Sequence, residues 1–594
     1  MSWVAGGLSG SASRSGEAAG GTGGGTGYMA FNPLEIPACR ARMLGTGFAG
    51  GKAKGLFLAE QVLARHGLLG TRVTIPPTWV LPTGVFERFL DDNGLGRFSP
   101  GARSGEEYEE IVSHFRRAPL PGQVRERLAS WLREVDYPLA VRSSAFLEDS
   151  LRYSFAGKYH TAFIPNRGPL AARLEALEAA IKEVYASVYC PDAVAYRQRR
   201  GLGDDSMAVI LQKLVGEEHR DLFYPEISGV GFSRNYRCWS ERVRPGDGVL
   251  RLAFGLGTRC TGRGYARLAS LTNPDLRPEG NDPRDVARYS QEIFDALHLP
   301  SGRLQSWNVN ARPDVVACHP QFSRYAQLYL PGSNELVPPP PVLPGGPPGT
   351  RYVFSFPDLA RHFGPVIDTA RELFALLESP QAMDTPVDVE FTYATASGEF
   401  ALVQARPLSS YEEFRPVRVP SPLPGEVILQ GDRMMTNGQL EDVNHLVYVD
   451  PDLYRETADK ARVAREVGRI NDQLAGDRYI LVGPGRWGSS HPAQGVPVQY
   501  REVAHAGLLV ELGSREEAFI PELSYGTHFF ADLENDRILY LPVFTHLGTN
   551  VYNREWFDRY PAEGTGHPAV RIYRGRFSAY LDGHQPLGVV VRRP

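Results

Sequence analysis

Hydrophobic and polar positions along this 594-residue chain alternate between helical spacing and strand spacing. Apolar residues recur every three or four positions in two segments, which predicts amphipathic helices at residues 53–67 and 174–189. Runs rich in β-branched residues predict strands at residues 207–215 and 387–393. Because these elements interleave without regular β-α-β spacing, we expect an α+β fold, followed by a smaller mixed α/β region richer in short strands.

Stretches of biased composition divide the chain. Residues 1–28 are dominated by Gly, Ser, Ala and Thr and cannot bury enough apolar surface to order themselves, so we expect a disordered tail that ends before Met29, a second candidate start. Residues 337–349 are proline-rich and predict a stiff connector. A further proline cluster marks a boundary. We expect folded domains at residues 29–410 and 426–594, joined by a linker at 411–425.

Charge and cysteine usage narrow the function classes. The net charge is −4 and no polybasic run is present, so we expect no nucleic-acid partner. Five widely spaced cysteines without a C-x-x-C pair are typical of reduced thiols in a cytoplasmic protein. No apolar run approaches the roughly 20 residues of a membrane helix. With no secretory signal evident at the N-terminus, we predict a cytoplasmic protein without a membrane partner.

The first segment with candidate chemistry is GTGFAGGKAKGL, residues 45–56. Glycines before Lys52 at a predicted helix start are suited to holding phosphate through backbone N–H groups and the helix dipole. It is not a Walker loop, because Thr46 stands where the first glycine belongs and Ala53 where a hydroxyl belongs. A flexible helix-capping loop explains the segment equally well.

The second segment is VRSSAFLEDSLRYSFAGKYHTAF, residues 141–163. We interpret its start as a strand with Arg142 at its end, and arginine is suited to bidentate phosphate contacts. Gly157 lies in a following loop where a backbone can approach a ligand closely. The alternative is a surface strand in which Arg142 forms a salt bridge with Glu148 or Asp149.

The third segment, VDVEFTYATASGEFALVQARPL at residues 387–408, predicts a β-hairpin. A three-residue loop at 396–398 would set Thr395 opposite Glu399, and counting back pairs Glu390 with Gln404 and Asp388 with Arg406. Alternation then places those four polar residues on one face and the following on the other: Val389, Ala401, Val403 and Ala405.

Glu390 and Gln404 together suit Mg²⁺ that carries nucleotide phosphates, and Arg406 suits charge on a transferred phosphoryl group. The alternative is a half-exposed hairpin with ordinary polar cross-strand pairs.

Two C-terminal segments also carry candidate groups. Residues 478–492 predict a strand followed by a Gly/Ser loop with Arg486, Trp487 and His491. That loop suits either an anion nest with an aromatic platform or a tightly packed turn. His528 follows a Gly-Thr turn, where it is a candidate phosphoryl acceptor or a structural histidine at a strand end.

Six segments occur in the order seen in one family: GGKAKGL, the strand and loop around Arg142, MAVILQKLV, ISGVGFSRN, LAFGLGTR and the hairpin. Residues 40–410 therefore resemble the N-terminal nucleotide-binding domain of pyruvate phosphate dikinase and phosphoenolpyruvate synthase, an ATP-grasp fold shared by rifampin phosphotransferase. Two features of that family are missing from the chain: its Thr-Ser-His-Ala type motif and room for its C-terminal (β/α)₈ barrel of about 250 residues.

The resemblance implies a role for each motif. Lys52 and Arg142 would bind ATP phosphates, and the loop at 154–161 with Gly157 would close over them. A hinge strand would meet the adenine edge, and Mg²⁺ would bind beside Arg406, which would act at the transferred phosphoryl group. The hinge residues are Gln212, Leu214 and Val215, and the Mg²⁺ ligands are Glu390 and Gln404.

We therefore predict an ATP- and Mg²⁺-dependent phosphotransferase of the kinase or dikinase type. Its acceptor is either a histidine of the C-terminal part, with His528 the best candidate, or an unidentified small molecule bound there. An ATP-grasp ligase that forms an acyl phosphate is a second hypothesis. A non-catalytic nucleotide-sensing module is the third.

Overall fold

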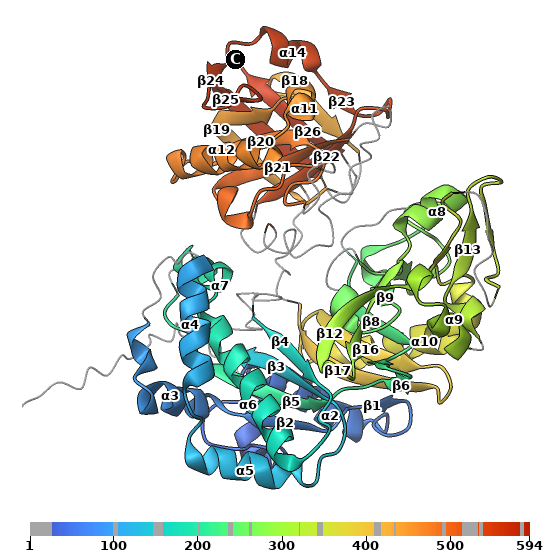
Figure 1. The fold of residues 1–594 in the computed structure, drawn as a ribbon. Coiled ribbons are helices and arrows are strands. Elements are labelled where there is room, and N and C mark those ends of the chain that lie inside the picture. The colour runs from blue at the N-terminus through green and yellow to red at the C-terminus, as the bar shows by residue number, and fades with distance from the viewer. Residues whose placement is uncertain are drawn as a thin grey trace, which may run out of the picture.

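The chain forms two folded parts, which Figure 1 shows as an N-terminal body in blue to yellow and a C-terminal body in orange to red. The computed structural model describes the following residues: 27–98, 105–146, 159–199, 202–235, 242–260, 264–319, 321–340, 348–408, 417–432, 435–489, 495–513, 533, 538–582 and 587–594.

An antiparallel four-stranded sheet begins the N-terminal body, in the order β2-β5-β3-β4. Its strands are β2 Thr78–Leu81, β3 Leu139–Ala145, β4 Thr161–Ile164 and β5 Met207–Lys213. Apolar side chains on one face of this sheet pack against four helices. Those helices are α3 Thr83–Asp92, α4 Gly105–Arg117, α5 Gly122–Leu132 and α6 Leu170–Ala186.

A six-stranded sheet forms the second layer, in the order β1-β17-β16-β8-β9-β10. Its strands are β1 Val73–Thr74, β8 Ile227–Phe232, β9 Val249–Ala253, β10 Arg267–Ser270, β16 Val387–Ala394 and β17 Glu399–Pro407. Helix α2, Gly51–Arg65, packs its Ala53 and Phe57 against the first sheet and its Gly55 against the backbone of β17. The two sheets therefore meet around one helix, whose N-terminus carries Lys52.

Smaller sheets extend the second layer. Strands β6 Glu217–His219, β7 Leu222–Tyr224, β11 Ile293–His298 and β12 Arg303–Asn308 form one of them. Strands β13 Gln327–Leu330, β14 Glu335–Val337 and β15 Arg351–Val353 form the other. Since β14 and β15 both pair with β13, the proline-rich segment at 337–349 joins two strands of one sheet.

The remaining N-terminal helices are α1 Pro37–Arg40, α7 Pro191–Arg199, α8 Pro283–Tyr289, α9 Pro313–Cys318 and α10 Leu359–Leu377.

The hairpin β16–β17 differs from the predicted loop but keeps the predicted site pairs. Ala394 pairs with Glu399, so four residues form the loop, and Thr395 opposite Glu399 is wrong. A β-bulge at Val403 then restores the register, and Glu390 faces Gln404 as predicted. The same bulge reverses the faces beyond it: Phe400 and Leu402 enter the core, and Ala401 lies on the polar face opposite Thr392.

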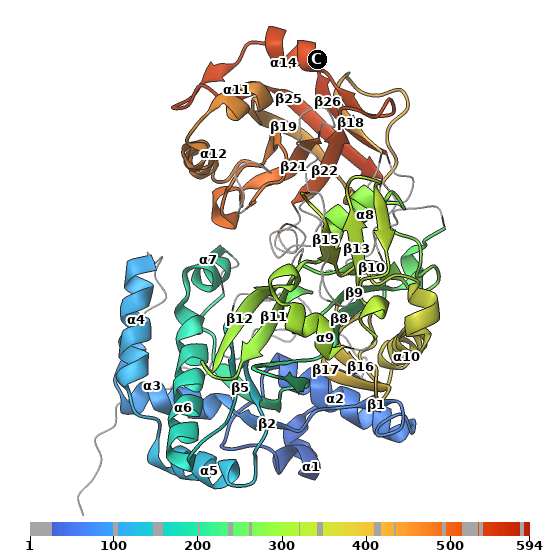
Figure 2. The same cartoon turned by 45° about the vertical axis from the view of Figure 1, so that its right-hand side comes forward.

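The C-terminal body is built on one mixed nine-stranded sheet, in which β22-β21-β20-β19 are parallel neighbours and β25, β26, β18 and β23 continue the order. Side chains alternate between its two faces: Ile480 and Val482 pack on one side, Tyr479 and Leu481 on the other. Helices α12 Lys460–Gln473 and α14 Arg554–Arg559 supply apolar residues to opposite faces, and Figure 2 shows α12 beside the sheet.

The strands of this sheet are β18 Glu426–Gly431, β19 Gly438–Val449, β20 Tyr479–Pro484, β21 Ala506–Gly513, β22 Leu539–Phe544, β23 Val551–Tyr552, β24 Glu563–Gly564, β25 Val570–Asp582 and β26 Leu587–Arg593. Helix α11 spans Pro451–Glu456.

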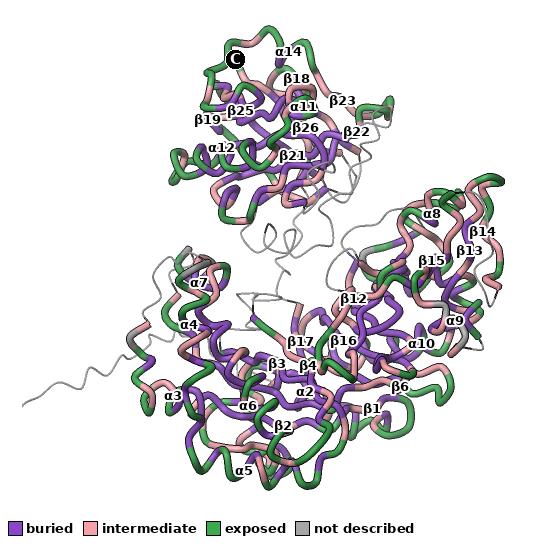
Figure 3. The backbone as a smooth tube through the Cα atoms, viewed as in Figure 1, coloured by how far each residue is buried: buried purple, intermediate pink, exposed green. Residues whose placement is uncertain are grey.

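The burial pattern agrees with the predicted α+β class. Figure 3 shows buried backbone running through the strands of both bodies, with exposed residues on the outer sides of the helices. The helix predicted at 53–67 is α2, and the one predicted at 174–189 is α6 continued by a short 3₁₀ turn. Within the described part of the chain no helix has the length and hydropathy to cross a bilayer, and the four cysteines described there are free thiols.

Candidate functional site

Arg142 lies at the centre of a polar cluster between the two N-terminal sheets. It stands in the middle of β3, between β5 and β4, and not at a strand end as predicted. Its side chain is 12% exposed and forms an ion pair with Glu390. It also donates to Gln404 Oε1 at 2.7 Å and to Gln212 Oε1 at 3.2 Å. A buried guanidinium therefore joins strands of both sheets.

Lys52 reaches the same cluster from α2. Its Nζ lies 3.2 Å from Ser143 Oγ, the neighbour of Arg142 on β3. Gly50, at the N-cap of α2 with φ 77°, lies so close to β3 that a Cβ there would come within 1.6 Å of the Ser144 carbonyl oxygen. Ser144 Oγ accepts a hydrogen bond from Ala53 N–H at 3.1 Å. The glycines thus allow close packing on β3, and a serine from that strand caps the helix.

Glu390 and Gln404 face each other across the hairpin, beside the guanidinium of Arg142. Burial alone would raise the pKa of Glu390, but the positive charges of Arg142, Lys52 and Arg406 outweigh it and hold that pKa below its ordinary value. Glu390 is therefore an anion at neutral pH. Its carboxylate and the amide oxygen of Gln404 are hard oxygen donors, the type that Mg²⁺ prefers.

Arg406 lies one pair farther along the hairpin. Its Nε and Nη2 donate to Asp388 Oδ2 at 2.9 and 2.6 Å, across the predicted pair of residues. Asp388 is 4% exposed, so this carboxylate holds the guanidinium in a fixed position at the edge of the cluster. The four polar residues of the hairpin thus share one face, as predicted.

The predicted hinge connects the two layers. Gln212, near the end of β5, has a buried side chain, and its Nε2 donates to the Val403 carbonyl at the bulge, at 3.2 Å. Leu214 is buried in the core, and its N–H donates to the Pro138 carbonyl at 2.8 Å. Val215 lies beside them on the connection to β6. The segment that leaves the first sheet is therefore anchored to both layers.

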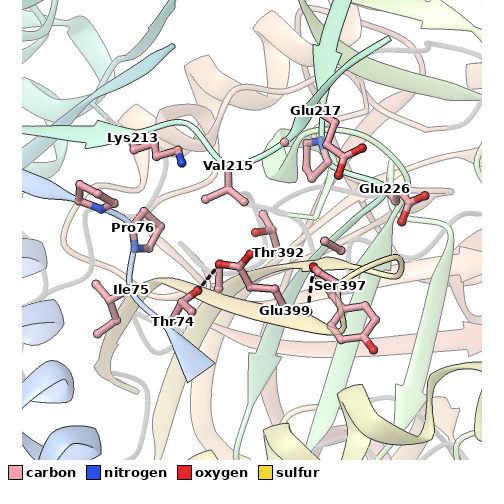
Figure 4. A pocket seen from close by; sticks show the side chains of 16 residues that line it. Thr74, Ile75, Pro76, Lys213, Val215, Glu217, Glu226, Thr392, Ser397 and Glu399 are labelled. Atoms are coloured by element: carbon pink, nitrogen blue, oxygen red, sulfur yellow. Dashed lines mark hydrogen bonds between the residues drawn. The ribbon is translucent and has the colours of Figure 1, made fainter. Parts of the chain in front are cut away.

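A cleft of about 310 Å³ opens beside this hinge (Figure 4). Two chain connections border it, residues 74–77 and 213–217, and its third wall is the polar face of the hairpin near Thr392 and Glu399. Figure 4 shows Lys213 and Val215 on one side and Thr392 and Glu399 on the other. Because Thr392 shares a face with Glu390, the cleft continues the polar cluster toward the hairpin loop.

Several groups of the candidate site were missed by the sequence interpretation. Ser143 and Ser144 contact Lys52 and the start of α2, and their position next to Arg142 was the available signal. The Val403 carbonyl, which accepts from both Arg142 and Gln212, is exposed by a bulge that no residue type predicts. Across the residues that the structure describes, no group of three or more His, Cys, Asp or Glu forms a ready metal site.

Some predicted residues fall elsewhere. Gly157, His491 and His528 lie outside the described residues, as do Glu148 and Asp149, the alternative partners of Arg142. Trp487 as an aromatic platform is wrong, because its side chain is fully buried. Its Nε1 donates to the Val510 carbonyl at 3.1 Å and its backbone N–H to Glu511 at 3.0 Å, so it packs the turn after β20.

Part of the chain is similar to proteins of one known family. Residues 46–264 match the family model described as pyruvate phosphate dikinase, AMP/ATP-binding domain. The match contains Lys52, Arg142 and Gln212 and ends before the hairpin.

Three curated relatives are similar over part of their length. Phosphoenolpyruvate synthase of Aeropyrum pernix is 30% identical over 195 residues, which cover 30% of this chain and 22% of that protein. The uncharacterized phosphotransferase YvkC of Bacillus subtilis is 28% identical over 211 residues, 34% of this chain and 21% of that protein. Rifampicin phosphotransferase of Bacillus cereus is 29% identical over 178 residues, 29% and 18% of the two chains. The chain thus matches about a fifth of each relative's length.

Proposed function

We propose that the chain is an ATP-dependent phosphotransferase, in which residues 46–264, the AMP/ATP-binding domain of the pyruvate phosphate dikinase family, bind the nucleotide. The observation that carries the proposal is the convergence of five side chains from one helix and four strands. Lys52 comes from α2, Arg142 from β3, Gln212 from β5, and Glu390 and Gln404 from the hairpin β16–β17. Basic groups beside a carboxylate and an amide suit a nucleotide triphosphate with its divalent cation.

The order of groups along β3 supports this assignment. The hinge end of β3 pairs with Gln212 and Lys213, Arg142 stands in the middle, and Ser143 with Lys52 follows. We place the adenosine in the cleft beside Val215 and the phosphates at Arg142 and Lys52. Leu214 would form part of the hinge without a backbone hydrogen bond to the adenine, because its N–H already donates to the Pro138 carbonyl. Gly157 would approach the phosphates from the loop after β3.

Glu390 and Gln404 would hold Mg²⁺, which would neutralise charge on the phosphates. Two protein oxygens suffice for such a site, because Mg²⁺ usually keeps waters and takes phosphate oxygens as further ligands. Arg142 now neutralises Glu390, and we expect it to turn to the phosphates when Mg-ATP binds. Arg406, fixed by Asp388, would stabilise charge on the transferred phosphoryl group.

The acceptor is either a histidine of the C-terminal body, with His528 the candidate, or a small molecule. The name of one relative, rifampicin phosphotransferase, refers to a small molecule as the acceptor and supports the second alternative. A ligase that releases ADP and a nucleotide sensor without turnover remain the competing functions.

The test follows the fate of ATP labelled separately at the β and γ positions, with Mg²⁺ and the full chain, together with the intact mass of the protein. AMP and a phosphoryl adduct that disappears in His528→Ala would establish a dikinase with a protein histidine. ADP without an adduct would establish direct transfer or ligation. Absence of ATP binding would refute the proposal.

Arg406→Ala separates an enzyme from a sensor. We expect turnover to fall by roughly a hundredfold or more, as when one group that stabilises transferred charge is lost, while ATP still binds. Arg72→Ala is the matched control, because Arg72 also pairs with a carboxylate, Glu372, on the exposed surface. Equal turnover in Arg406→Ala and the wild type would contradict the role of Arg406.

A further inference from the structure

Two exposed phenylalanines contact each other just beyond the end of β3 that lies away from the hinge. The Phe48 and Phe146 side chains are 61% and 57% exposed, and their ring centroids lie 5.7 Å apart at an interplanar angle of 57°. A single exposed apolar residue is ordinary on a protein surface. A contacting aromatic pair at the edge of a candidate active site is less so, because it offers a larger apolar surface for a ligand.

Both backbones are held in place. Phe48 N–H donates to Thr83 Oγ1 at 3.1 Å, and Thr83 N–H donates back to the Phe48 carbonyl at 2.9 Å. Phe146 N–H donates to the Ser206 carbonyl at 2.9 Å, directly beyond the last pair of β3 with β5. The rings therefore project from a fixed framework, which lowers the ordering cost of binding.

The pair lies at the end of the site away from the hinge. Along β3, Ala140 pairs with Gln212 at the hinge, Arg142 follows, and Phe146 comes after the final pair. These six steps of extended chain span about 20 Å. Phe48 lies four residues before Lys52 on the approach to α2. If adenosine lies at the hinge and phosphates at Arg142 and Lys52, the phenylalanines stand where an acceptor approaches.

We propose that Phe48 and Phe146 seat the phosphoryl acceptor, a small molecule with a hydroxyl on an aromatic or flat apolar ring. This rests on the proposed function. The acceptor oxygen would bond to the transferred phosphorus while the phosphoanhydride bond breaks, with its electron pair on the leaving nucleotide and the hydroxyl proton passing to solvent.

A ring fits this surface better than a protein partner does. Two side chains offer far less than the roughly 800 Å² that each partner of a stable protein interface buries. They also offer no charge, so a small polar acid would gain little from them. A ring laid against the pair buries its apolar face and leaves its oxygen free to face Lys52, four residues after Phe48.

The experiment measures binding of 2-naphthol to the full chain by saturation-transfer NMR, with Mg²⁺ and the β,γ-imido analogue of ATP present. In the double variant Phe48→Ser/Phe146→Ser we expect a roughly fivefold loss of affinity, the equivalent of one aromatic contact. Leu304→Ser is the matched control, since Leu304 is 39% exposed and lies on β12. Its affinity for 2-naphthol should equal that of the wild type.

Binding of the ATP analogue is titrated separately by calorimetry in each variant. Failure of the wild type to bind the analogue would refute the proposed function. Analogue binding without 2-naphthol binding, or equal 2-naphthol affinity in the double variant, would overturn the acceptor seat alone. If the double variant has a larger radius of gyration than the wild type, the two phenylalanines hold parts of the chain together. That result would also overturn the acceptor seat. Phe48→Leu/Phe146→Leu, which keeps apolar side chains, serves as the second variant if serine disturbs folding.

Discussion

At the scale of single residues, Glu390 is the group whose charge decides whether the cluster repels or binds a nucleotide. Its carboxylate is an anion held by Arg142, and it faces the amide of Gln404. Without a cation, this negative charge repels phosphates. With Mg²⁺, the same charge becomes a ligand.

Glu390→Gln should therefore weaken ATP binding in the presence of Mg²⁺ by about tenfold or more, which is one lost charged ligand at about 1.4 kcal/mol. Without Mg²⁺ the variant should bind ATP as well as the wild type or better, because the repulsion is gone. Titration with a fluorescent ATP analogue, with and without EDTA, measures both. Glu335→Gln is the control, because Glu335 is exposed on β14 and does not line the cleft. Equal losses with and without Mg²⁺ would contradict a metal role for Glu390.

Glu226 is a specific carboxyl group whose protonation should lower the stability of the fold at acidic pH. Burial alone would raise its pKa, but hydrogen bonds from His319 and from the Thr395 side chain and backbone lower it to about 2. A carboxyl whose folded pKa lies below its unfolded value contributes stability above about pH 4.5. That contribution disappears as the pH falls from 4.5 toward 2.

Glu226→Gln should thus cost on the order of 1–2 kcal/mol in the free energy of unfolding at pH 7, after allowance for its partial exposure. The difference from wild type should shrink at pH 3, because the wild-type carboxyl also begins to lose its advantage there. Urea denaturation at both pH values measures this, with the exposed Glu217→Gln as control. A cost that stays constant with pH would show that the charge is not responsible.

At the scale of elements, α2 determines where Lys52 lies. Gly55 packs so tightly on β17 that a Cβ would come within 2.1 Å of the Ala405 carbonyl oxygen, a backbone atom that cannot move aside cheaply. Gly364 in α10 has no heavy atom within 4 Å of the corresponding position. Alanine at either position would favour the helix, but only at position 55 would it clash with a neighbouring backbone. A comparison of the two substitutions therefore separates helix propensity from close packing.

Gly55→Ala should lower the melting temperature and weaken ATP binding, although alanine favours a helix by about 1 kcal/mol over glycine. Overpacking of this kind costs about 1–3 kcal/mol. Gly364→Ala should leave ATP binding unchanged and hold or raise the melting temperature. Calorimetric melting of both variants tests the pair, and an equal effect of the two substitutions would rule out the packing argument.

The elements also show what the sequence could predict. Helices α2 and α6 and the strands β5 and β16 follow from spacing, because their apolar periodicity is sustained over whole elements. The hairpin loop does not, since glycine at Gly398 is compatible with three or four loop residues. The predicted count was one residue short at the loop, and the bulge at Val403 compensates for it: only with that bulge do Glu390 and Gln404 face each other.

The candidate site, like the elements, was only partly predictable from the sequence. Lys52, Arg142 and the hairpin residues were recognisable as types suited to phosphate and metal. The ion pair between Arg142 and Glu390 was not, because it joins positions 248 residues apart, and local patterns carry no information about such contacts. The alternative partners considered for Arg142 were local for that reason. For Trp487 the sequence left two alternatives open, and the packed turn is confirmed, because a glycine-rich loop says little about whether its aromatic residue points outward or into the core.

At the scale of the whole molecule, the N-terminal and C-terminal bodies have separate cores. The largest apolar clusters of the first lie within residues 28–405, and those of the second within residues 428–590. Each cluster draws on its own sheets and helices. Independent cores of this size are expected to unfold as separate cooperative units.

Calorimetry of the full chain should therefore resolve at least two unfolding transitions, and Mg-ATP should raise only the one that belongs to the N-terminal body. A ligand that binds the folded state alone stabilises it by about 2.7 kcal/mol at one hundred times its dissociation constant. Arg142→Ala, which removes the centre of the cluster, should abolish the shift and leave the second transition in place. If Mg-ATP raises both transitions together, the nucleotide couples the two bodies, and the C-terminal body then takes part in the nucleotide-bound state and is more than a separately folded neighbour.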